Sequence, residues 1–217
     1  MPYHQPIKIE GLDDDSLLEK VQKILQENRK VKTATEAMIL LLALGGTLSL
    51  AAIAPNVLGA ISRLRRERQM RKREKYRKLW RSFYDLKKQR WVEFVREEEN
   101  FLVYKVNEKG KEKIKKFVFE KLQPELPKKW DKKWRLVIFD IPEKRRRERA
   151  ALRKKLIEIG FYQCQKSAWI YPFDCIHEIE FIKDFLKIGP YVKTFTITDM
   201  EDGKVLYHFR HLLKDYL

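Results

Sequence analysis

Residues 134–175 read WRLVIFDIPEKRRRERAALRKKLIEIGFYQCQKSAWIYPFDC, and this stretch decides the fold of the second half of the chain. Residues 135–141 predict a strand, and its successive apolar positions Leu136–Phe139 predict that it is buried on both faces inside a sheet. Residues 143–159 predict a helix, and residues 161–173 are rich in β-forming side chains over a length that suits two short strands. Three apolar side chains of the helix are expected to face the core: Leu152, Leu156 and Ile159.

The segments that follow complete a recognisable order of elements. Residues 175–188 predict a second helix with an apolar stripe, and the run VKTFTIT at 192–198 predicts a last strand. Strand, helix, strand, strand, helix, strand is the order of a ferredoxin-like βαββαβ domain. The tail KVLYHFRHLLKDYL predicts one further short element.

The first half of the chain predicts a different architecture. Helices are expected at 13–28, 35–45 and 47–61, followed by a basic helix at 73–91, with Asp15 or Ser16 capping the first helix and Thr35 the second. A β-hairpin over 92–107 and a closing helix come next, so the order is that of a winged helix-turn-helix. The predicted fold class is therefore α+β, divided as follows: 1–122 helical and winged-helix domain, 123–133 proline- and lysine-containing linker, 134–217 ferredoxin-like domain.

The charge of the chain points to a polyanionic partner. Forty-eight Lys and Arg stand against 31 Asp and Glu, a net charge of +17 over 217 residues. Residues 61–90 carry 14 basic and 3 acidic residues, a net of +11, and residues 144–155 carry 8 basic residues and 1 acid, a net of +7. Charge gathered in this way is typical of a nucleic-acid footprint, although a solvated basic helix would show the same composition.

A helix over 73–91 would separate apolar and cationic side chains onto two faces. Arg77, Arg81 and Lys88, with Tyr84 beside them, share the face away from the core. Such a helix can enter a major groove while the hairpin reaches the DNA backbone, although the acidic hairpin tip at Glu97–Glu99 is unfavourable there. The residues expected to contact double-stranded DNA are Arg73, Arg77, Lys78, Arg81, Tyr84, Lys88, Arg96, Lys105, Arg146, Arg149 and Arg153.

One segment raises the alternative of a membrane anchor. Residues 37–62 contain no charged side chain, which is long enough to span a bilayer. Gly45-Gly46 and Pro55-Asn56 divide the segment into shorter pieces that suit buried helices, so membrane insertion is not expected. The N-terminus has no secretory signal, and Cys164 and Cys175 are not in a metal-ligand spacing, so a cytoplasmic location is expected.

The stretch KWRLVIFDIPEKRRRERAALRKKLIEIGFYQCQKSAWIYPFDC resembles the central domain of PaaX-type transcriptional regulators. That domain is itself similar to the small ferredoxin-like endonuclease of the CRISPR spacer-acquisition complex. The shared features are the strand ending in FDIPE, the arginine-rich helix, LIEIGF and QKSAWIYP. The stretches LGGTLSLAAIAPNVL and VYKVNEKGKEKI resemble the winged-helix half of the same group. PaaX-type regulators usually carry a further C-terminal domain, which is not expected here beyond the ferredoxin-like domain, so their acyl-CoA-type effector response is not expected to carry over.

The resemblance leaves two interpretations of Asp140, the residue at the end of the first strand of the second half. In the CRISPR-associated nucleases an aspartate at this position is proposed to bind a divalent metal near the dimer axis, which would require Mg²⁺ or Mn²⁺ here. Alternatively, Asp140 and Pro142 shape the strand-to-helix turn, with the carboxylate accepting hydrogen bonds from helix amides or pairing with Arg145–Arg147.

The sequence thus predicts a dimeric, DNA-binding transcriptional regulator, with a repressor as the expected type. The resemblance implies DNA binding and homodimerisation, and no cofactor is expected for such a protein. The alternative is a metal-dependent endonuclease acting on DNA or RNA, in which Asp140 would be both the catalytic and the metal-binding residue.

Overall fold

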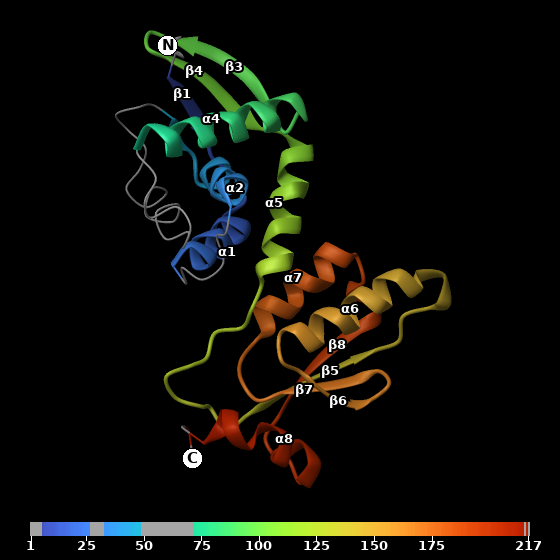
Figure 1. The fold of residues 1–217 in the computed structure, drawn as a ribbon. Helices are drawn as coiled ribbons and strands as arrows, with labels where there is room; N and C mark the ends of the chain where they lie inside the picture. The colour runs from blue at the N-terminus through green and yellow to red at the C-terminus, as the bar shows by residue number, and fades with distance from the viewer. Residues whose placement is uncertain (1–5, 27–32, 49–71, 215, 217) are drawn as a thin grey trace. The chain divides into compact units, whose positions relative to one another are not determined.

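The computed structural model describes residues 6–26, 33–48, 72–214 and 216. The chain forms two compact units, 1–121 and 122–217, each with helices and a four-stranded sheet, so the fold is α+β (Figure 1). The two units are described separately below.

The N-terminal unit opens with a short strand and two capped helices. Strand β1 (Ile7–Glu10) precedes α1 (Asp15–Gln26) and α2 (Ala34–Leu44). The cap of α1 is Asp14, whose carboxylate accepts the Leu17 amide at 3.0 Å, so the predicted cap at Asp15 or Ser16 was wrong. The predicted cap Thr35 was also wrong: Thr33 forms a capping box with Glu36, in which each side chain accepts the other residue's amide at 3.1 Å.

The sheet of this unit joins segments that are far apart in the sequence. Its order is β2-β1-β4-β3, with β2 at Gly46–Leu48, β3 at Val92–Glu98 and β4 at Phe101–Val106. Strand β1 pairs parallel to β4 and antiparallel to β2, so the N-terminal strand lies between them. A register shift after Phe94 turns Arg96 to the same face of the sheet as Lys8.

Two further helices lie in the described part of the N-terminal unit. Helix α4 (Lys72–Lys88) precedes the β3–β4 hairpin, and α5 (Glu108–Lys121) follows it. Helix α2 contacts α1, α4 and α5, and its fully buried Met38 and Leu40–Leu42 supply the centre of the core. Burying a side chain of this size stabilises the fold by about 1.5–3 kcal/mol.

The apolar segment 37–62 does not form one helix. Gly45 ends α2 with a positive φ of 73°, and residues 46–48 form β2, so the predicted helix 47–61 cannot begin at residue 47. The rest of that predicted helix lies outside the described residues. Within the described ranges, no helix has the length and apolar character needed to cross a membrane.

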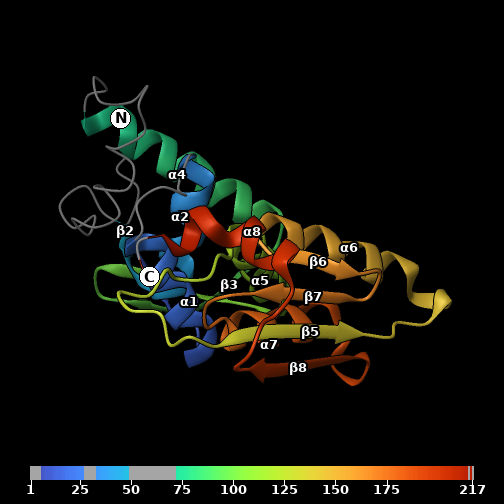
Figure 2. The same cartoon turned by 90° about the horizontal axis from the view of Figure 1, so that it is seen from below.

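The C-terminal unit has the predicted order of strands and helices. Its sheet contains β5 (Trp134–Phe139), β6 (Tyr162–Gln165), β7 (Ala168–Tyr171) and β8 (Val192–Ile197). The strands lie side by side in the order β6-β7-β5-β8, and every neighbouring pair is antiparallel (Figure 2). Strand β5 is therefore central, as its continuous apolar run predicts.

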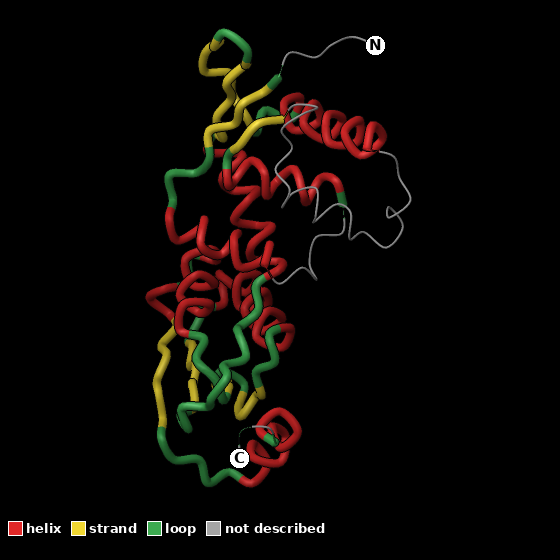
Figure 3. The backbone as a smooth tube through the Cα atoms, turned by 90° about the vertical axis from the view of Figure 1, so that its left-hand side faces the viewer, coloured by secondary structure: helices red, strands yellow, loops and turns green. Residues whose placement is uncertain are grey.

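Helices cover both faces of this sheet. Two of them, α6 (Arg146–Glu158), which follows the short 3-10 turn Glu143–Arg145, and α7 (Ile176–Leu186), lie on one face. The last helix, α8 (Gly203–Leu213), lies beyond the other face and contacts β6 (Figures 1 and 3). The predicted inward side chains of α6, Leu152, Leu156 and Ile159, are buried.

The end of the predicted linker packs on the C-terminal unit. The indole of Trp130 donates to the Pro172 carbonyl at 2.6 Å and packs edge-to-face against Trp134. Arg135, only 4% exposed, donates to both oxygens of Asp131 at 3.0 and 2.6 Å. The segment before β5 is thus bound to the first two residues of that strand.

Candidate nucleic-acid interface

Helix α4 presents one apolar and one cationic face. Leu79, Phe83 and Leu86 are at most 1% exposed, while the opposite side carries a stripe of exposed side chains: Arg77, Arg81, Tyr84 and Lys88. These four positions recur at intervals of four, three and four residues, which places them on one side of a helix. We call them the α4 stripe. Its exposure agrees with the face predicted from the sequence.

The buried face of α4 holds the stripe in place. The ring of Phe83 meets Tyr104 of β4 edge-on at 5.3 Å, and the Lys87 ammonium donates to the Tyr104 hydroxyl at 2.8 Å. The ring of Tyr84 lies 5.5 Å from that of Trp80, a buried residue one turn earlier. The part of α4 from Leu79 to Lys87 is therefore packed against the core, which fixes the position of the stripe.

Two other predicted contacts lie on α4. Arg73 is in its first turn, and its side chain is outside the described part of the structure. Lys78 is half-buried and already interacts with another group of the protein, so it is less available than the stripe. The whole helix carries eight basic residues and two acids, Glu74 and Asp85, a net charge of +6.

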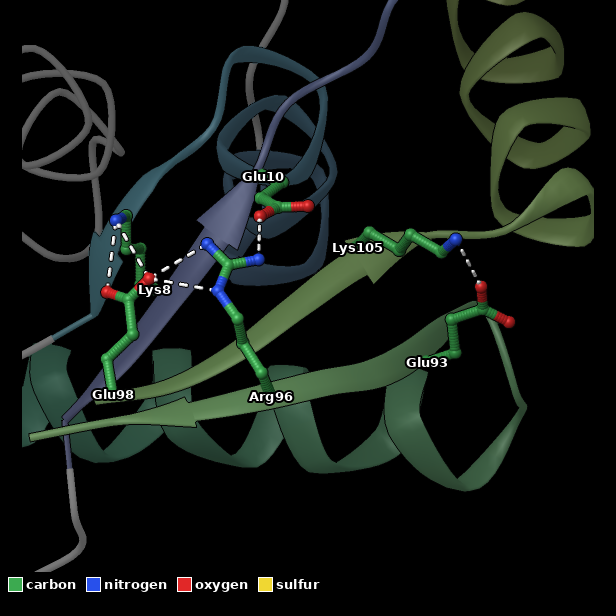
Figure 4. A network of polar contacts seen from close by, with 6 residues as sticks. All are labelled: Lys8, Glu10, Glu93, Arg96, Glu98 and Lys105. Atoms are coloured by element: carbon green, nitrogen blue, oxygen red, sulfur yellow. Dashed lines mark hydrogen bonds and ion pairs between the residues drawn. The ribbon is translucent and has the colours of Figure 1, made fainter.

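The outer face of the sheet in this unit carries a network of ion pairs (Figure 4). Arg96 donates to Glu10 at 2.7 Å and to Glu98 at 2.8 Å, and Glu98 also accepts from Lys8 at 3.1 Å. Hydrogen bonds from Lys8 and Arg96 hold the pKa of the Glu98 carboxyl below its usual value, and the two carboxylates raise the pKa of Arg96. All of these groups reach solvent, so each pair contributes little to stability.

These ion pairs reduce the positive charge that the hairpin presents to an anionic partner. Arg96 is held by two carboxylates, and the other predicted hairpin contact, Lys105, pairs with Glu93 at 3.1 Å. With Lys8 included, three cations on this face meet three carboxylates, and the face is close to neutral. Sequence analysis missed Lys8 and Glu10, because they come from β1, which gives no local signal that it will pair beside residue 102.

The arginine-rich helix α6 has one predicted DNA-contacting arginine exposed to solvent and two that bond to other groups of the protein. Arg146 is exposed. Arg149 is half-buried, pairs with Glu143 at 2.5 Å and donates to the Ile141 carbonyl at 3.0 Å. Arg153 donates to the Lys166 carbonyl at 2.8 Å, and its guanidinium lies 5.7 Å from the centre of the Phe139 ring. Of the three predicted contacts on this helix, Arg146 is the one presented to solvent without such ties.

Asp140 directly follows β5, and its side chain is exposed. Its amide donates to the Tyr191 carbonyl at 2.9 Å, while its carboxylate has no hydrogen bond or ion pair within the described ranges. The expected bonds to helix amides are absent there, and Pro142, not Asp140, occupies the cap of the following turn.

The expected pairing of Asp140 with the neighbouring arginines is not seen either, for a physical reason. Arg145 instead donates to the Lys187 carbonyl at 2.6 Å and the Leu186 carbonyl at 3.3 Å. These carbonyls end α7, where a cation is favoured by the helix dipole. In the described part of the chain, no three His, Cys, Asp or Glu side chains gather in a way that could hold a metal ion.

The site and the fold define a two-unit α+β protein with a cationic helix exposed beside a hairpin in its first unit. Residues 127–205 match the family described as PaaX protein central Cas2-like domain. The matched segment covers β5 to β8 and ends within the first turn of α8. A search of curated proteins found no match.

Proposed function

We propose that this protein is a dimeric transcriptional regulator, a repressor in its expected form, that binds double-stranded DNA through the α4 stripe. The observation that carries the proposal is the exposure of Arg77, Arg81 and Lys88 along one face of a helix whose other face is buried. Three cations at this spacing suit the phosphates beside a major groove, and the exposed part of Tyr84 adds a flat contact surface. The match of 127–205 to a domain of PaaX proteins supports a role in regulation.

We propose that the N-terminal unit is a winged helix. Helix α4 leads into β3 through the turn at Gln89–Arg90, and β3 pairs antiparallel to β4 with a two-residue turn. This is the order of a recognition helix followed by a wing. The wing's outer face is nearly neutral, so the proposal assigns the main contact to α4 and a minor one to the wing.

The test is a binding assay with matched variants. Replacing Arg77, Arg81 and Lys88 with alanine should abolish most duplex binding and make the dependence of log K on log salt shallower by about 3, since each lost phosphate contact contributes about 0.9. The control replaces Lys115, Lys128 and Lys129, which are exposed elsewhere, and removes the same charge. Equal binding by both variants would contradict the assignment, because net charge alone would then explain the affinity.

The C-terminal unit is proposed to be a ferredoxin-like dimerisation domain. Its βαββαβ order and antiparallel strand order β6-β7-β5-β8 support that fold. The register of β5 with β8 places Leu136 beside Phe195 on the sheet face opposite α6 and α7, and Ile138 and Phe195 are 39% and 45% exposed. An apolar sheet face of this kind is suited to a second copy, and a two-fold dimer would match palindromic DNA. No cofactor is part of this proposal, and a cytoplasmic location accords with it.

A metal-dependent endonuclease is the second candidate, and Asp140 is the observation that favours it. Its carboxylate is exposed and accepts no bond within the described residues, so it is open to a cation. One carboxylate alone provides few ligands for a metal ion, so the second copy in a dimer would have to supply a second carboxylate. Cleavage of DNA or RNA that requires Mg²⁺ or Mn²⁺ and disappears in Asp140→Asn would support this candidate; no cleavage with either metal would remove it.

A further inference from the structure

Helix α8 carries exposed side chains that neither the fold nor the proposed duplex contact uses. Three of its apolar residues are buried: Val205, Phe209 and Leu213. Its other side leaves Tyr207 66% exposed, and Arg210 is exposed beside it. Most of the helix lies beyond the segment 127–205 that matches the family, so that match assigns it no role.

A shallow hollow of about 590 Å³ lies between this helix and β6. It is lined by Tyr162, Gly203, Lys204, Tyr207, His208 and Arg210. Apart from Gly203, each lining residue supplies an aromatic ring or a cationic group, and none of them is acidic. Five of the six are exposed, so the hollow is open to solvent along its length.

The ring groups of the hollow are already arranged in pairs. The guanidinium of Arg210 lies 3.6 Å from the centre of the Tyr207 ring and donates to the Tyr207 carbonyl at 2.6 Å. The rings of Tyr162 and His208 are 4.7 Å apart, and His208 also meets Phe209 edge-on at 4.7 Å. A ring that is fixed in this way and still exposed loses little entropy when a flat ligand stacks on it.

The charge around the hollow is also distinctive. Residues 156–217 contain seven basic and nine acidic residues, yet 203–214 contain three of those basic residues and no acid. The nearest preceding acid, Asp202, is held by the helix itself, since its carboxylate accepts the Lys204 amide at 2.8 Å. The hollow is therefore a local cationic site on an otherwise acidic segment.

We propose that this hollow binds an unpaired nucleotide of a single-stranded nucleic acid. The base would stack on the face of the Tyr207 ring that Arg210 does not cover, and Lys204 would hold a neighbouring phosphate. Exposed rings beside cations in an open groove are the combination that single strands use, because every base has a stacking face and the backbone is anionic. An apolar ligand would gain nothing from the cations, and a small inorganic anion nothing from the rings. The inference goes beyond duplex binding by α4 and concerns another unit of the chain.

The experiment uses the full chain and a labelled deoxythymidine strand of about ten nucleotides, which spans a site of this kind. Fluorescence anisotropy should show that Tyr207→Ala raises the Kd about tenfold, within the range expected for loss of one stacked base. Tyr207→Phe, which keeps the ring, should stay within about twofold of the unaltered chain. The matched control is Leu206→Ala, an exposed apolar neighbour outside the lining, which should bind normally.

Three results would overturn the proposal. These are unchanged binding by Tyr207→Ala, equal loss in Leu206→Ala, and full displacement of the strand by thymidine monophosphate at similar concentration, which would indicate a free-nucleotide site.

The α4 variant lacking Arg77, Arg81 and Lys88 separates this proposal from the first. It should lose duplex binding and keep the single strand, whereas loss of both would assign the single strand to α4 instead. Photocrosslinking of an iodouracil-containing strand should label a peptide that contains Tyr207.

Discussion

Arg135 shows how one buried cation fixes the start of the central strand. Its guanidinium donates to Asp131 and to the Lys133 carbonyl, and its side chain is 5% exposed. The sequence places this arginine inside an apolar run, where a cation is costly unless it is paired. The pairing with Asp131 resolves that cost and explains why the segment before β5 belongs to the C-terminal unit.

We expect Asp131→Asn to lower the free energy of unfolding of this unit by about 1–3 kcal/mol, since the buried guanidinium of Arg135 would lose the opposing negative charge and one of its two acceptor oxygens. Urea unfolding followed by the fluorescence of Trp130 and Trp134, which stack beside the pair, would measure it. Asp174→Asn is the control, because Asp174 lies 3.6 Å from Arg135 and should matter less. An equal loss in both variants would contradict a dominant role for Asp131.

The same pair predicts a pH dependence. The side-chain hydrogen bond from Arg135 holds the pKa of Asp131 below its ordinary value. A lowered carboxyl pKa means that the stabilisation is present above the pKa of the unfolded chain and is lost as pH falls through the folded pKa. The stability difference between the unaltered chain and Asp131→Asn should therefore shrink below about pH 4. A difference that stays constant to pH 2 would show that the carboxylate charge is not its source.

At the scale of elements, the contact between α5 and the hairpin depends on one glycine. Gly110 is buried in the first turn of α5, and a Cβ at this position would lie 2.2 Å from the Trp91 carbonyl oxygen. We expect Gly110→Ala to destabilise the N-terminal unit by about 1–3 kcal/mol or more, because backbone must move to admit the methyl group. Thermal unfolding would measure this, and Gly189→Ala, which meets nothing within 4 Å, should be neutral.

The ion-pair network on the hairpin gives a second prediction for an element. In Glu98→Gln, Lys8 and Arg96 lose a shared carboxylate, so this face of the sheet gains one net positive charge beside the hairpin. If the wing lies near the duplex, affinity should rise severalfold and the salt dependence should steepen by about 0.9 for one added phosphate contact. Unchanged affinity, measured beside the α4 variants, would show that this face points away from DNA.

The sequence predicted the elements better than it predicted their partners. The order of strands and helices in the second half follows from local patterns, such as the apolar run of β5 and the stripe of α6, and the structure agrees with it. The place of β1 does not follow, because Ile7 pairs with Leu102 and no short-range pattern encodes that register. The capping box of α2 is a local feature, so the pattern Thr33-x-x-Glu36 is enough to predict it.

The same difference holds for the candidate site. The exposed stripe on α4 follows from helical periodicity alone, since the apolar positions of the helix define its opposite face. The pairing of Arg96, Arg149 and Arg153 cannot be predicted in this way. Arg96 bonds to a carboxylate of β1, and Arg149 to a carboxylate and a carbonyl that precede α6. Arg153 bonds to a carbonyl that precedes β7. Which cation is free is decided by tertiary contacts, and composition cannot distinguish a tied arginine from an available one.

For the whole molecule, the proposed function depends on two copies acting together. The second copy is proposed to pack on the part of the sheet face opposite α6 and α7 where Ile138 of β5 and Phe195 of β8 are exposed, on the same face as α8. Replacing both residues with glutamate would place two carboxylates per subunit on the interface, which would have to be desolvated and would repel their symmetry mates. Ile157→Glu is the control, because Ile157 is 62% exposed on α6.

We expect the double variant to be monomeric by light scattering during size-exclusion chromatography, while the Ile157 variant stays dimeric. Loss of the dimer separates two DNA contacts that otherwise share an effective local concentration, so affinity for a palindromic duplex should fall by about 100-fold or more. Affinity for a single half-site should change little, because each monomer keeps its α4 stripe. A monomeric variant that binds the palindrome as tightly as the unaltered chain would show that each copy of the protein reads its DNA alone.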